Sequence, residues 1–457
     1  MAHATAVINI VALSSSLIGA HTPRIAAFAA SGRVQRLTPV LPAVTCCVQS
    51  SMLTGLPPRE HGIVGNGWYD RTLCEVQFWK QSNRLVSGEK VWETARRRDP
   101  SITCANMFWW FNMYATADFS VTPRPQYRAD GRKIPDCYTH PADLRDILQR
   151  DLGPFPLFKF WGPGASIESS QWIADATRLV WERSTPTLTL VYLPHLDYPL
   201  QKVGPEHPSI AGELQAIDRL VGQLIDFFEQ RGVRVILLSE YGIEPVDDSV
   251  HINRILREAG LLAVREENGR ELLDAGASRA FAVADHQIAH VYIHDESAIS
   301  NVQQLCESTP GVARVLDREA QHAIGLDHAR SGELVLIASP RRWFSYDYWL
   351  DDRRAPDFAR TVDIHRKPGY DPLELFIDPL LALPKARIAW TLLRKAVGQR
   401  TLFNIIPLDT RLVRGSHGRV DQPAPFKPVL ITRQGASAGE ELPCTAVRDV
   451  ILTHLFD

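Results

Sequence analysis

The chain has 457 residues, of which 45% are hydrophobic and 22% are charged, and its 50 basic and 52 acidic residues give a formal charge of −2. This length exceeds the usual size of a single core, so it predicts one large α/β domain with an insertion, or two domains. The balanced charge provides no bulk attraction to nucleic acid or to an anionic membrane, and we expect neither as a partner.

Seven cysteines are scattered along the chain without C-x-x-C spacing. This pattern argues against a disulfide framework and a zinc knuckle, and it favours a reducing compartment, the cytoplasm. The N-terminal run AVINIVALSSSLIGA has the apolar character of a signal-peptide core, but no Lys or Arg precedes it. We interpret it as a first buried strand, with a signal peptide as the alternative. No apolar stretch approaches the roughly 20 residues that span a bilayer.

In chain order, the predicted elements alternate between strands and helices. The apolar run from Val7 to Leu13 predicts a strand buried on both faces, and a helix is expected from Thr22 to Ser31. Ser87 is expected to cap the helix in GEKVWETARRR, and Ile102 to Asn106 to form the next strand. This rhythm favours a doubly wound α/β fold with a mostly parallel central sheet.

Two later buried strands are each followed by a carboxylate. Leu188 to Leu193 leads to Asp197, and Val233 to Leu238 leads to Glu240 and Tyr241. Ligands of doubly wound sheets bind at the carboxyl edge of the strands. A single acid there is often only a helix cap, but two acids in matching positions favour a site.

The composition changes between about Arg257 and Ile324. Charged helices surround FAVADHQIAHVYIHD, a period-two segment that predicts one strand with His286, His290 and His294 on one face. Along a strand these histidines lie too far apart to share a metal ion. We therefore expect residues 257–324 to form an inserted α+β cap on a core made of residues 1–256 and 325–457.

The stretch from Thr38 to Asp70 contains the strongest candidate nucleophile. Thr45 begins a helix-forming run, which a turn-rich segment and the glycine-flanked Asn66 follow. Free N–H groups and the dipole at a helix N-terminus favour a bound anion, so this position suits Thr45 as a nucleophile. Thr45 as a simple N-cap is the alternative. Cys46 is a rival nucleophile that has no obvious activating base.

Four segments, PAVTCCVQSSMLTGLPPREHGIVGN, YLPHLD, LLSEYG and GSHGR, occur in this order. Together they resemble the alkaline phosphatase superfamily, and within it the nucleotide pyrophosphatase/phosphodiesterase branch, also called type I phosphodiesterases. The resemblance implies the superfamily's α/β core, a covalent phospho-enzyme on Thr45, and a phosphate contact from Asn66. It also implies two divalent metal ions. The corresponding ligand positions are Asp197, Gln201 and His417 for one ion, and Val11, Thr45, Glu240 and Tyr241 for the other.

Three of these positions depart from the family pattern. Val11 cannot bind a metal, Tyr241 is an unusual zinc ligand, and Gln201 offers only a neutral oxygen, which suits Mg²⁺ or Mn²⁺ better than Zn²⁺. We therefore expect one or two divalent ions (Zn, Mn or Mg) at Asp197, Glu240, His417 and His365. His365 would replace a missing imidazole or act as a general acid, with a loop histidine as the alternative. Tyr241 and Gln201 would then contact the substrate together with Asn66.

The predicted function is a metal-dependent hydrolase that cleaves a phosphodiester, pyrophosphate or phosphonate bond in a small phosphorylated metabolite, through a phospho-threonine intermediate. The alternative is a divergent family member that has lost hydrolysis, and that binds a phosphorylated metabolite or catalyses another biosynthetic step. The substitutions at Val11, Gln201 and Tyr241 motivate this alternative. His61 is expected to brace the HGIVGN turn. The sequence leaves open the roles of His286, His290 and His328. It also leaves open the oligomeric state, with a homo-oligomer as one possibility.

Overall fold

The computed structural model of the chain describes residues 2–399, 401–433 and 439–457. At its centre, β1 (Thr5–Ile10) and β10 (Leu188–Leu193) pair in parallel, and every residue of both strands is buried. The predicted first strand is thus confirmed as a central strand, although Val11 to Leu13 continue as a buried loop at its carboxyl end. An apolar run buried on both faces is typical of a strand that helices cover on each side.

The central sheet is mostly parallel, as predicted. The strands from β11 to β6 pair in parallel, whereas β22 and β9 pair antiparallel with their neighbours. In spatial order the strands are β23 (Glu441–Pro443), β2 (Arg33–Thr38), β22 (Val429–Thr432), β11 (Arg234–Leu238), β1, β10, β5 (Cys104–Met107), β6 (Phe119–Pro123) and β9 (Cys137–His140).

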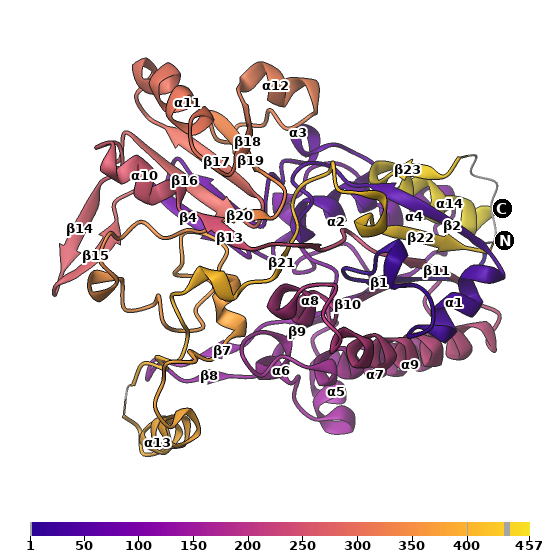
Figure 1. Cartoon of the computed structure of the whole chain (residues 1–457). Coiled ribbons are helices and arrows are strands. Elements are labelled where there is room, and N and C mark those ends of the chain that lie inside the picture. Colours follow the sequence, from indigo (N-terminus) through magenta and orange to yellow (C-terminus); the bar gives the residue numbers. More distant parts are fainter. Residues whose placement is uncertain (1, 400, 434–438) are drawn as a thin grey trace.

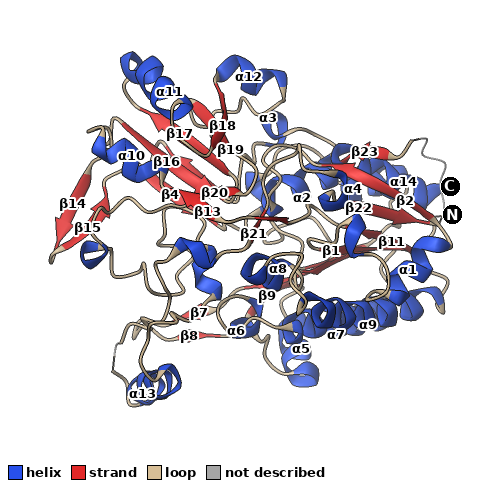
Figure 2. Cartoon of the chain, viewed as in Figure 1, coloured by secondary structure: helices blue, strands red, loops and turns tan. Residues whose placement is uncertain are grey.

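Helices cover both faces of this sheet (Figures 1 and 2). One face carries α1 (Pro23–Ala30), α5 (Leu144–Leu152), α6 (Leu157–Phe160), α7 (Ile167–Ser184) and α9 (Ile210–Glu229). The other carries α2 (Thr45–Thr54), α4 (Val91–Arg98) and α14 (Val447–Phe456). The remaining helices of the core are the short α3 (Pro58–His61) and α8 (Asp197–Val203), and α13 (Pro384–Ala396), which lies at the periphery. No helix in the described part of the chain is long and apolar enough to cross a membrane.

The N-terminus of α4 differs from the prediction. Lys90, not Ser87, is the N-cap residue, and its backbone N–H donates to Glu93 Oε2 at 2.8 Å. Glu93 occupies the third helical position, from which a carboxylate can reach back to the first free N–H group of a helix. The N-cap of α4 therefore lies three residues later than the predicted cap at Ser87.

A second, antiparallel sheet lies beside the core in the order β16 (Ala280–Asp285), β17 (Ile288–Ile293), β19 (Leu334–Ala338) and β18 (Val312–Leu316). Its helices are α10 (Ile252–Glu258), α11 (Ile299–Glu307) and α12 (Arg318–Ala323). Because β19 pairs with β17, this sheet extends beyond the cap boundary expected at residue 324. The pairing of β17 with β19 joins segments that are distant in the chain, and local sequence patterns do not encode such pairing.

The predicted single strand through FAVADHQIAHVYIHD is wrong, because the segment forms a hairpin. Asp285 and Ile288 are the last paired residues of β16 and β17, and the turn between them holds His286 at φ 60°. His286 therefore lies in the turn, whereas His290 lies in β17. The chain reverses within a continuous period-two pattern, so alternation alone did not reveal the turn.

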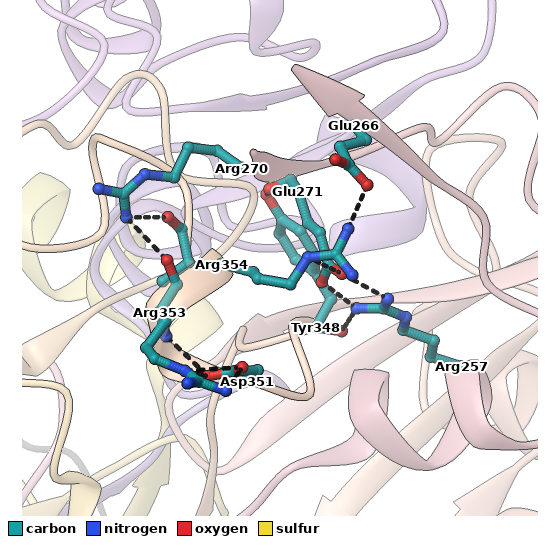
Figure 3. Close-up of polar contacts among 9 residues, drawn as sticks. Arg257, Glu266, Arg270, Glu271, Tyr348, Asp351, Arg353 and Arg354 are labelled. Atoms are coloured by element: carbon teal, nitrogen blue, oxygen red, sulfur yellow. Dashed lines mark hydrogen bonds and ion pairs between the residues drawn. The ribbon is translucent and has the colours of Figure 1, made fainter. Parts of the chain in front are cut away.

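Two-stranded pairs and an ion-pair network lie outside the two larger sheets. The remaining two-stranded pairs are β3 (Gly67–Asp70) with β4 (Glu75–Phe78), β7 (Gln126–Tyr127) with β8 (Lys133–Ile134), β12 (Glu244–Pro245) with β21 (Gly415–Ser416), β13 (Asp248–Val250) with β20 (Arg342–Phe344), and β14 (Val264–Glu267) with β15 (Arg270–Leu273). Buried Glu271 of β15 accepts from Arg257 of α10 and from Arg354, which fixes β15 against both segments (Figure 3). Hydrogen bonds from Arg257 hold the pKa of Glu271 below its usual value.

The core and the cap meet at the N-terminus of α2. Here Cys46, Cys47 and Ile63 pack in one apolar cluster with Ile288 and Val335 of the cap sheet. This junction positions the turn between β16 and β17 next to the carboxyl edge of the central sheet, where the candidate site lies.

Candidate active site

Thr45 is the first residue of α2, and it is not the N-cap. Val44 fills that position in an extended conformation, with φ −128° and ψ 156°. The Thr45 hydroxyl therefore does not cap the helix, and its Oγ1 lies 3.1 Å from the phenol oxygen of Tyr241. This arrangement leaves the hydroxyl available for chemistry at the positive end of a helix.

Tyr241 links Thr45 to a carboxylate. Its hydroxyl donates to Asp197 Oδ1 at 3.2 Å, and all three side chains are buried. Tyr241 follows β11 and Asp197 follows β10. Both residues therefore lie at the carboxyl edge of the central sheet, where the sequence predicts the site. Burial raises the pKa of Asp197 to about 7, against the opposing effect of hydrogen bonds from Tyr241 and Gln201. A carboxylate with such a pKa can take up a proton near neutral pH.

Glu240 is buried beside Thr45 and Asp197 and is held by two amide side chains. Its Oε1 accepts from Asn9 Nδ2 at 2.8 Å and from Gln49 Nε2 at 2.7 Å. Its Oε2 is buried and has no hydrogen-bond partner among the residues that the structure describes. Burial raises the pKa of Glu240 to about 8, although the hydrogen bonds from Gln49 and Asn9 oppose this rise. Burial thus favours the protonated, neutral form of Glu240 in the folded protein.

His417 lies flat against Tyr241, with ring centroids 3.6 Å apart and planes 6° from parallel. Its Nδ1 is placed to donate to the carbonyl of Ala43 at 2.8 Å, which assigns the free lone pair to Nε2. Nε2 lies 3.8 Å from Asp197 Oδ1 and has no hydrogen-bond partner in the described part of the chain. Burial lowers the pKa of His417 well below its usual value, so the ring is neutral.

Sequence reasoning missed Asp285 and left the role of His286 open, and the β16–β17 hairpin places both residues in the site. The His286 ring lies 3.8 Å from His417 and 3.6 Å from Tyr370 between centroids, and its Nδ1 lies 2.9 Å from Asp285 Oδ1. The adjacent Asp-His pair was a usable signal. It was overlooked because the segment was interpreted as one continuous strand.

Asn66 bridges the helix N-terminus and the cap. Its side-chain oxygen accepts from the Cys46 backbone N–H at 3.0 Å, and its side-chain nitrogen donates to Asp285 Oδ1 at 3.1 Å. Its own backbone N–H donates to Asp285 Oδ2 at 2.7 Å. The predicted phosphate-contacting residue thus lies beside Thr45, with its amide engaged on both sides.

Gln201 extends the network toward Tyr370. Its Nε2 donates to Asp197 Oδ2 at 2.8 Å, and its Oε1 accepts from the Tyr370 hydroxyl at 2.8 Å. Half-buried Trp79 and Trp161 lie beside Tyr370, at centroid distances of 6.2 and 5.8 Å. Trp79, Trp161 and Tyr370 therefore form an aromatic cluster next to the polar site.

The side chains at the site do not fit the two metal ions that the resemblance implies. Val11 is apolar, the oxygen of Gln201 already accepts from Tyr370, and Tyr241 lies between Thr45 and Asp197. Within the described residues, no group of three or more His, Cys, Asp or Glu side chains is arranged to hold a metal ion. The predicted set of Asp197, Glu240, His417 and His365 is therefore not assembled as one ligand shell.

His365 contacts a different part of the molecule. Its Nδ1 lies 3.4 Å from the carbonyl of Phe78, and its ring lies 6.2 Å from that of Tyr127. These are the contacts of a loop histidine.

His61 does brace its turn, because its Nδ1 accepts from the Ile63 N–H at 3.1 Å. Burial raises the pKa of the Cys46 thiol well above its usual value, which argues against Cys46 as a nucleophile.

A family model described as type I phosphodiesterase / nucleotide pyrophosphatase matches residues 5–371. The chain belongs to this family. The resemblance seen in the sequence is confirmed, and with it the alkaline-phosphatase-like core. The family is named for activity on phosphodiester and nucleotide pyrophosphate bonds.

Curated relatives match about half of this chain. It is 26% identical over 223 residues to an uncharacterised pyrophosphatase/phosphodiesterase of Schizosaccharomyces pombe, which covers 47% of this chain and 39% of that protein. It is 24% identical over 240 residues to ectonucleotide pyrophosphatase/phosphodiesterase family member 1 of Mus musculus, covering 50% of this chain and 22% of that protein. The matched segments thus span less than half of these type I phosphodiesterase relatives.

Solved structures match almost the whole fold. Phosphonoacetate hydrolase from Sinorhizobium meliloti 1021, in complex with phosphonoformate, has a TM-score of 0.61 at 13% identity, covering 98% of this chain and 95% of that chain. An inactive variant of murine ectonucleotide pyrophosphatase/phosphodiesterase 5, in complex with AMP, has a TM-score of 0.59 at 14% identity, covering 99% and 94%. At this identity the likeness shows the fold alone.

Proposed function

We propose that this protein hydrolyses a phosphodiester, pyrophosphate or phosphonate bond in a small phosphorylated metabolite, with Thr45 as the nucleophile. The observation that carries the proposal is the hydrogen-bonded chain from Thr45 through Tyr241 to Asp197 at the N-terminus of α2. The helix N-terminus favours the negative charge of phosphoryl oxygens, and the chain offers the Thr45 proton a path to a carboxylate. The AMP and phosphonoformate bound in the two structural neighbours support this class of substrate.

In the first step, Thr45 Oγ1 forms a bond to phosphorus, and the bond from phosphorus to the leaving group breaks, with its electron pair staying on the leaving group. The Thr45 proton moves to the Tyr241 oxygen while the Tyr241 proton moves to Asp197. Water then attacks the phospho-threonine, and the Thr45 oxygen leaves and regains a proton from that water. The proton held by Asp197 passes to the leaving group through solvent, which restores the free enzyme.

This route depends on the ionised form of Asp197 in the resting enzyme. Since burial raises the pKa of Asp197 to about 7, we expect the turnover rate to rise as the pH increases through about 7. The steps above use only side chains of this protein. We therefore expect a chelator to leave the rate within about twofold of its initial value, and elemental analysis to find less than about one equivalent of divalent metal.

The direct test combines turnover with detection of the covalent intermediate. Wild-type protein is offered a bis-aryl phosphodiester, a nucleoside triphosphate and a phosphonate, each with and without Mg²⁺, Mn²⁺ or Zn²⁺. We expect Thr45→Ala to reduce turnover by about 10³-fold or more, Thr45→Ser to retain part of it, and acid quenching to trap a phosphoryl group on Thr45 by mass spectrometry. Thr54→Ser, at the buried far end of α2, is the matched control. Equal rates for wild type and Thr45→Ala would refute the nucleophile.

One observation favours a second candidate, a protein that binds a phosphorylated metabolite without cleaving it. Val11, Gln201 and Tyr241 do not supply the metal ligands of the family, whereas Asn66 Nδ2 donates only one of its two N–H groups to Asp285 and keeps the other for a phosphoryl oxygen. Calorimetric titration with AMP and with a phosphonate separates the two candidates. Tight binding that Thr45→Ala leaves unchanged, together with no turnover of any substrate, would establish the binding protein.

A further inference from the structure

Helix α13 (Pro384–Ala396) presents an apolar face to solvent. Ala386, Ala389, Trp390, Leu393 and Val397 recur at the spacing of one helical face, and all five are exposed. The exposed fractions are 61% for Trp390, 55% for Leu393 and 68% for Val397. A helix of a globular protein normally turns such a face inward, so this orientation is reversed.

The opposite side of α13 makes the contacts with the protein. Ile388 packs against a cluster that contains Val246, Trp343 and Leu373, and Lys395 lies 5.2 Å from the ring centroid of Phe403. Figure 1 shows α13 at the edge of the molecule, apart from the helices that cover the central sheet. Helix α13 thus contacts the protein through the face that carries Ile388 and Lys395. Its exposed apolar face packs against no other described residues.

Basic residues surround this face. Residues 379–408 contain five Lys or Arg residues and no Asp or Glu. Lys385, Arg387 and Arg394 are exposed, and none of the three forms a salt bridge with any residue that the structure describes. Burial and, to a smaller extent, the nearby positive charge of Lys133 in β8 lower the pKa of Lys395, so the positive region extends to the β7–β8 hairpin. The formal charge of −2 for the whole chain conceals this local excess of positive charge.

Two leucines extend the apolar surface before the helix starts. Leu380 is 91% exposed and Leu383 is 77% exposed, so the segment that leads into α13 adds to the same uncovered region. Exposed apolar side chains gathered in one segment mark a site of association. Exposed Trp and Leu flanked by Lys and Arg is the composition of a helix that lies in the interface of a bilayer, with the aromatic ring at headgroup depth.

We propose that α13 and its leading segment bind the surface of an anionic lipid bilayer. The apolar face enters the boundary between headgroups and acyl chains, and Lys385, Arg387 and Arg394 contact the anionic headgroups beside it. The unpaired positive charges decide in favour of an anionic membrane over a second copy of this chain, since a second copy would bring the same cations into contact. The inference does not depend on the chemistry at Thr45.

The test is co-sedimentation of the purified full-length chain with lipid vesicles. We expect binding to mixed phosphatidylcholine/phosphatidylserine vesicles, at least tenfold weaker binding to phosphatidylcholine alone, and weakening at high salt. The double variant Trp390→Glu/Leu393→Glu and the double variant Arg387→Glu/Arg394→Glu should each reduce binding at least tenfold. All four side chains are exposed, so neither variant disturbs the core. Leu73→Glu, at a leucine with 58% exposure in the β3–β4 turn, is the matched control and should bind like wild type.

Light scattering after size-exclusion chromatography accompanies the vesicle assay. Failure of the wild-type chain to bind the mixed vesicles would overturn the proposal, and so would binding that both double variants retain. A wild-type dimer that Trp390→Glu/Leu393→Glu converts to a monomer, without any vesicle binding, would assign the face to a second copy instead. Binding to the mixed vesicles that requires Trp390, Leu393, Arg387 and Arg394 would establish α13 as a membrane-binding helix.

Discussion

The imidazole of His417 is stacked on the phenol ring of Tyr241, with centroids 3.6 Å apart. The stack fixes the Tyr241 hydroxyl between Thr45 and Asp197, at 3.1 and 3.2 Å. His417 corresponds to a metal ligand in the resemblance, yet here its ring packs face to face with the side chain that occupies another ligand position. The site thus keeps the positions of the family while it uses them for hydrogen bonding and packing.

Replacing Tyr241 by Phe tests the proton path. The ring stack with His417 is retained, but the hydroxyl that joins Thr45 to Asp197 is lost, so we expect turnover to fall by about 10²-fold or more, with unfolding midpoints little changed. Steady-state kinetics and thermal denaturation measure the two effects. Tyr346→Phe removes a buried hydroxyl that has no hydrogen-bond partner in the described structure, and it should leave turnover unaltered. A Tyr241→Phe enzyme with the wild-type rate would contradict the path.

Replacing Glu240 by Gln tests the effect of the buried acid on stability. The pKa of Glu240 is about 8 in the folded protein, above its value of about 4.3 in the unfolded chain. The stabilisation from the protonated form is therefore full below about pH 4 and is lost as the pH rises through about 8. We expect Glu240→Gln to gain stability relative to wild type between pH 5 and pH 9, as measured by urea unfolding at both values. Glu75→Gln, at an exposed position, should show no such trend.

Replacing Asp285 by Asn tests the contact between cap and core. Asp285 accepts from the backbone and the side chain of Asn66 and from His286, and an amide oxygen cannot replace all three acceptor contacts. A buried donor left without a partner costs about 1–3 kcal/mol, and we expect a loss of that size in urea unfolding. Asp421→Asn, whose side chain is 59% exposed, should change the free energy of unfolding by less than about 0.5 kcal/mol. Equal stabilities for the two variants would argue against the bridge.

Replacing Lys367 by Met tests the buried ion pairs that Lys367 forms with Asp371 and Glu374. The buried Lys367 ammonium lies 2.7 Å from Asp371 and 2.8 Å from Glu374, and the Trp161 indole N–H also donates to Glu374. Removal of the cation leaves two buried carboxylates unpaired, so we expect about 3–5 kcal/mol of destabilisation. Lys427→Met, which breaks a partly exposed pair with Glu441, should cost about 1 kcal/mol or less. Partial recovery in Lys367→Met/Asp371→Asn/Glu374→Gln would confirm that unpaired charge is the cause.

The sequence by itself determined the order of elements and the carboxyl-edge residues of the site. Apolar runs located β1, β10 and β11, because strands buried on both faces need continuous apolar side chains. The same reasoning placed Asp197 and Tyr241 beside each other at one sheet edge. The motif around Thr45 identified the family, since it is contiguous in the chain.

The tertiary structure alone decided how that edge is completed. Asp285 bonds to Asn66 across 219 residues of chain, and His286 meets His417 only because β16 and β17 reverse at a turn that the alternating pattern does not reveal. The hydrogen bond from Tyr370 to Gln201 and the outward apolar face of α13 likewise depend on which surfaces pack together. Local sequence determines secondary structure and strand ends, whereas contacts between distant segments are set by packing of the whole chain.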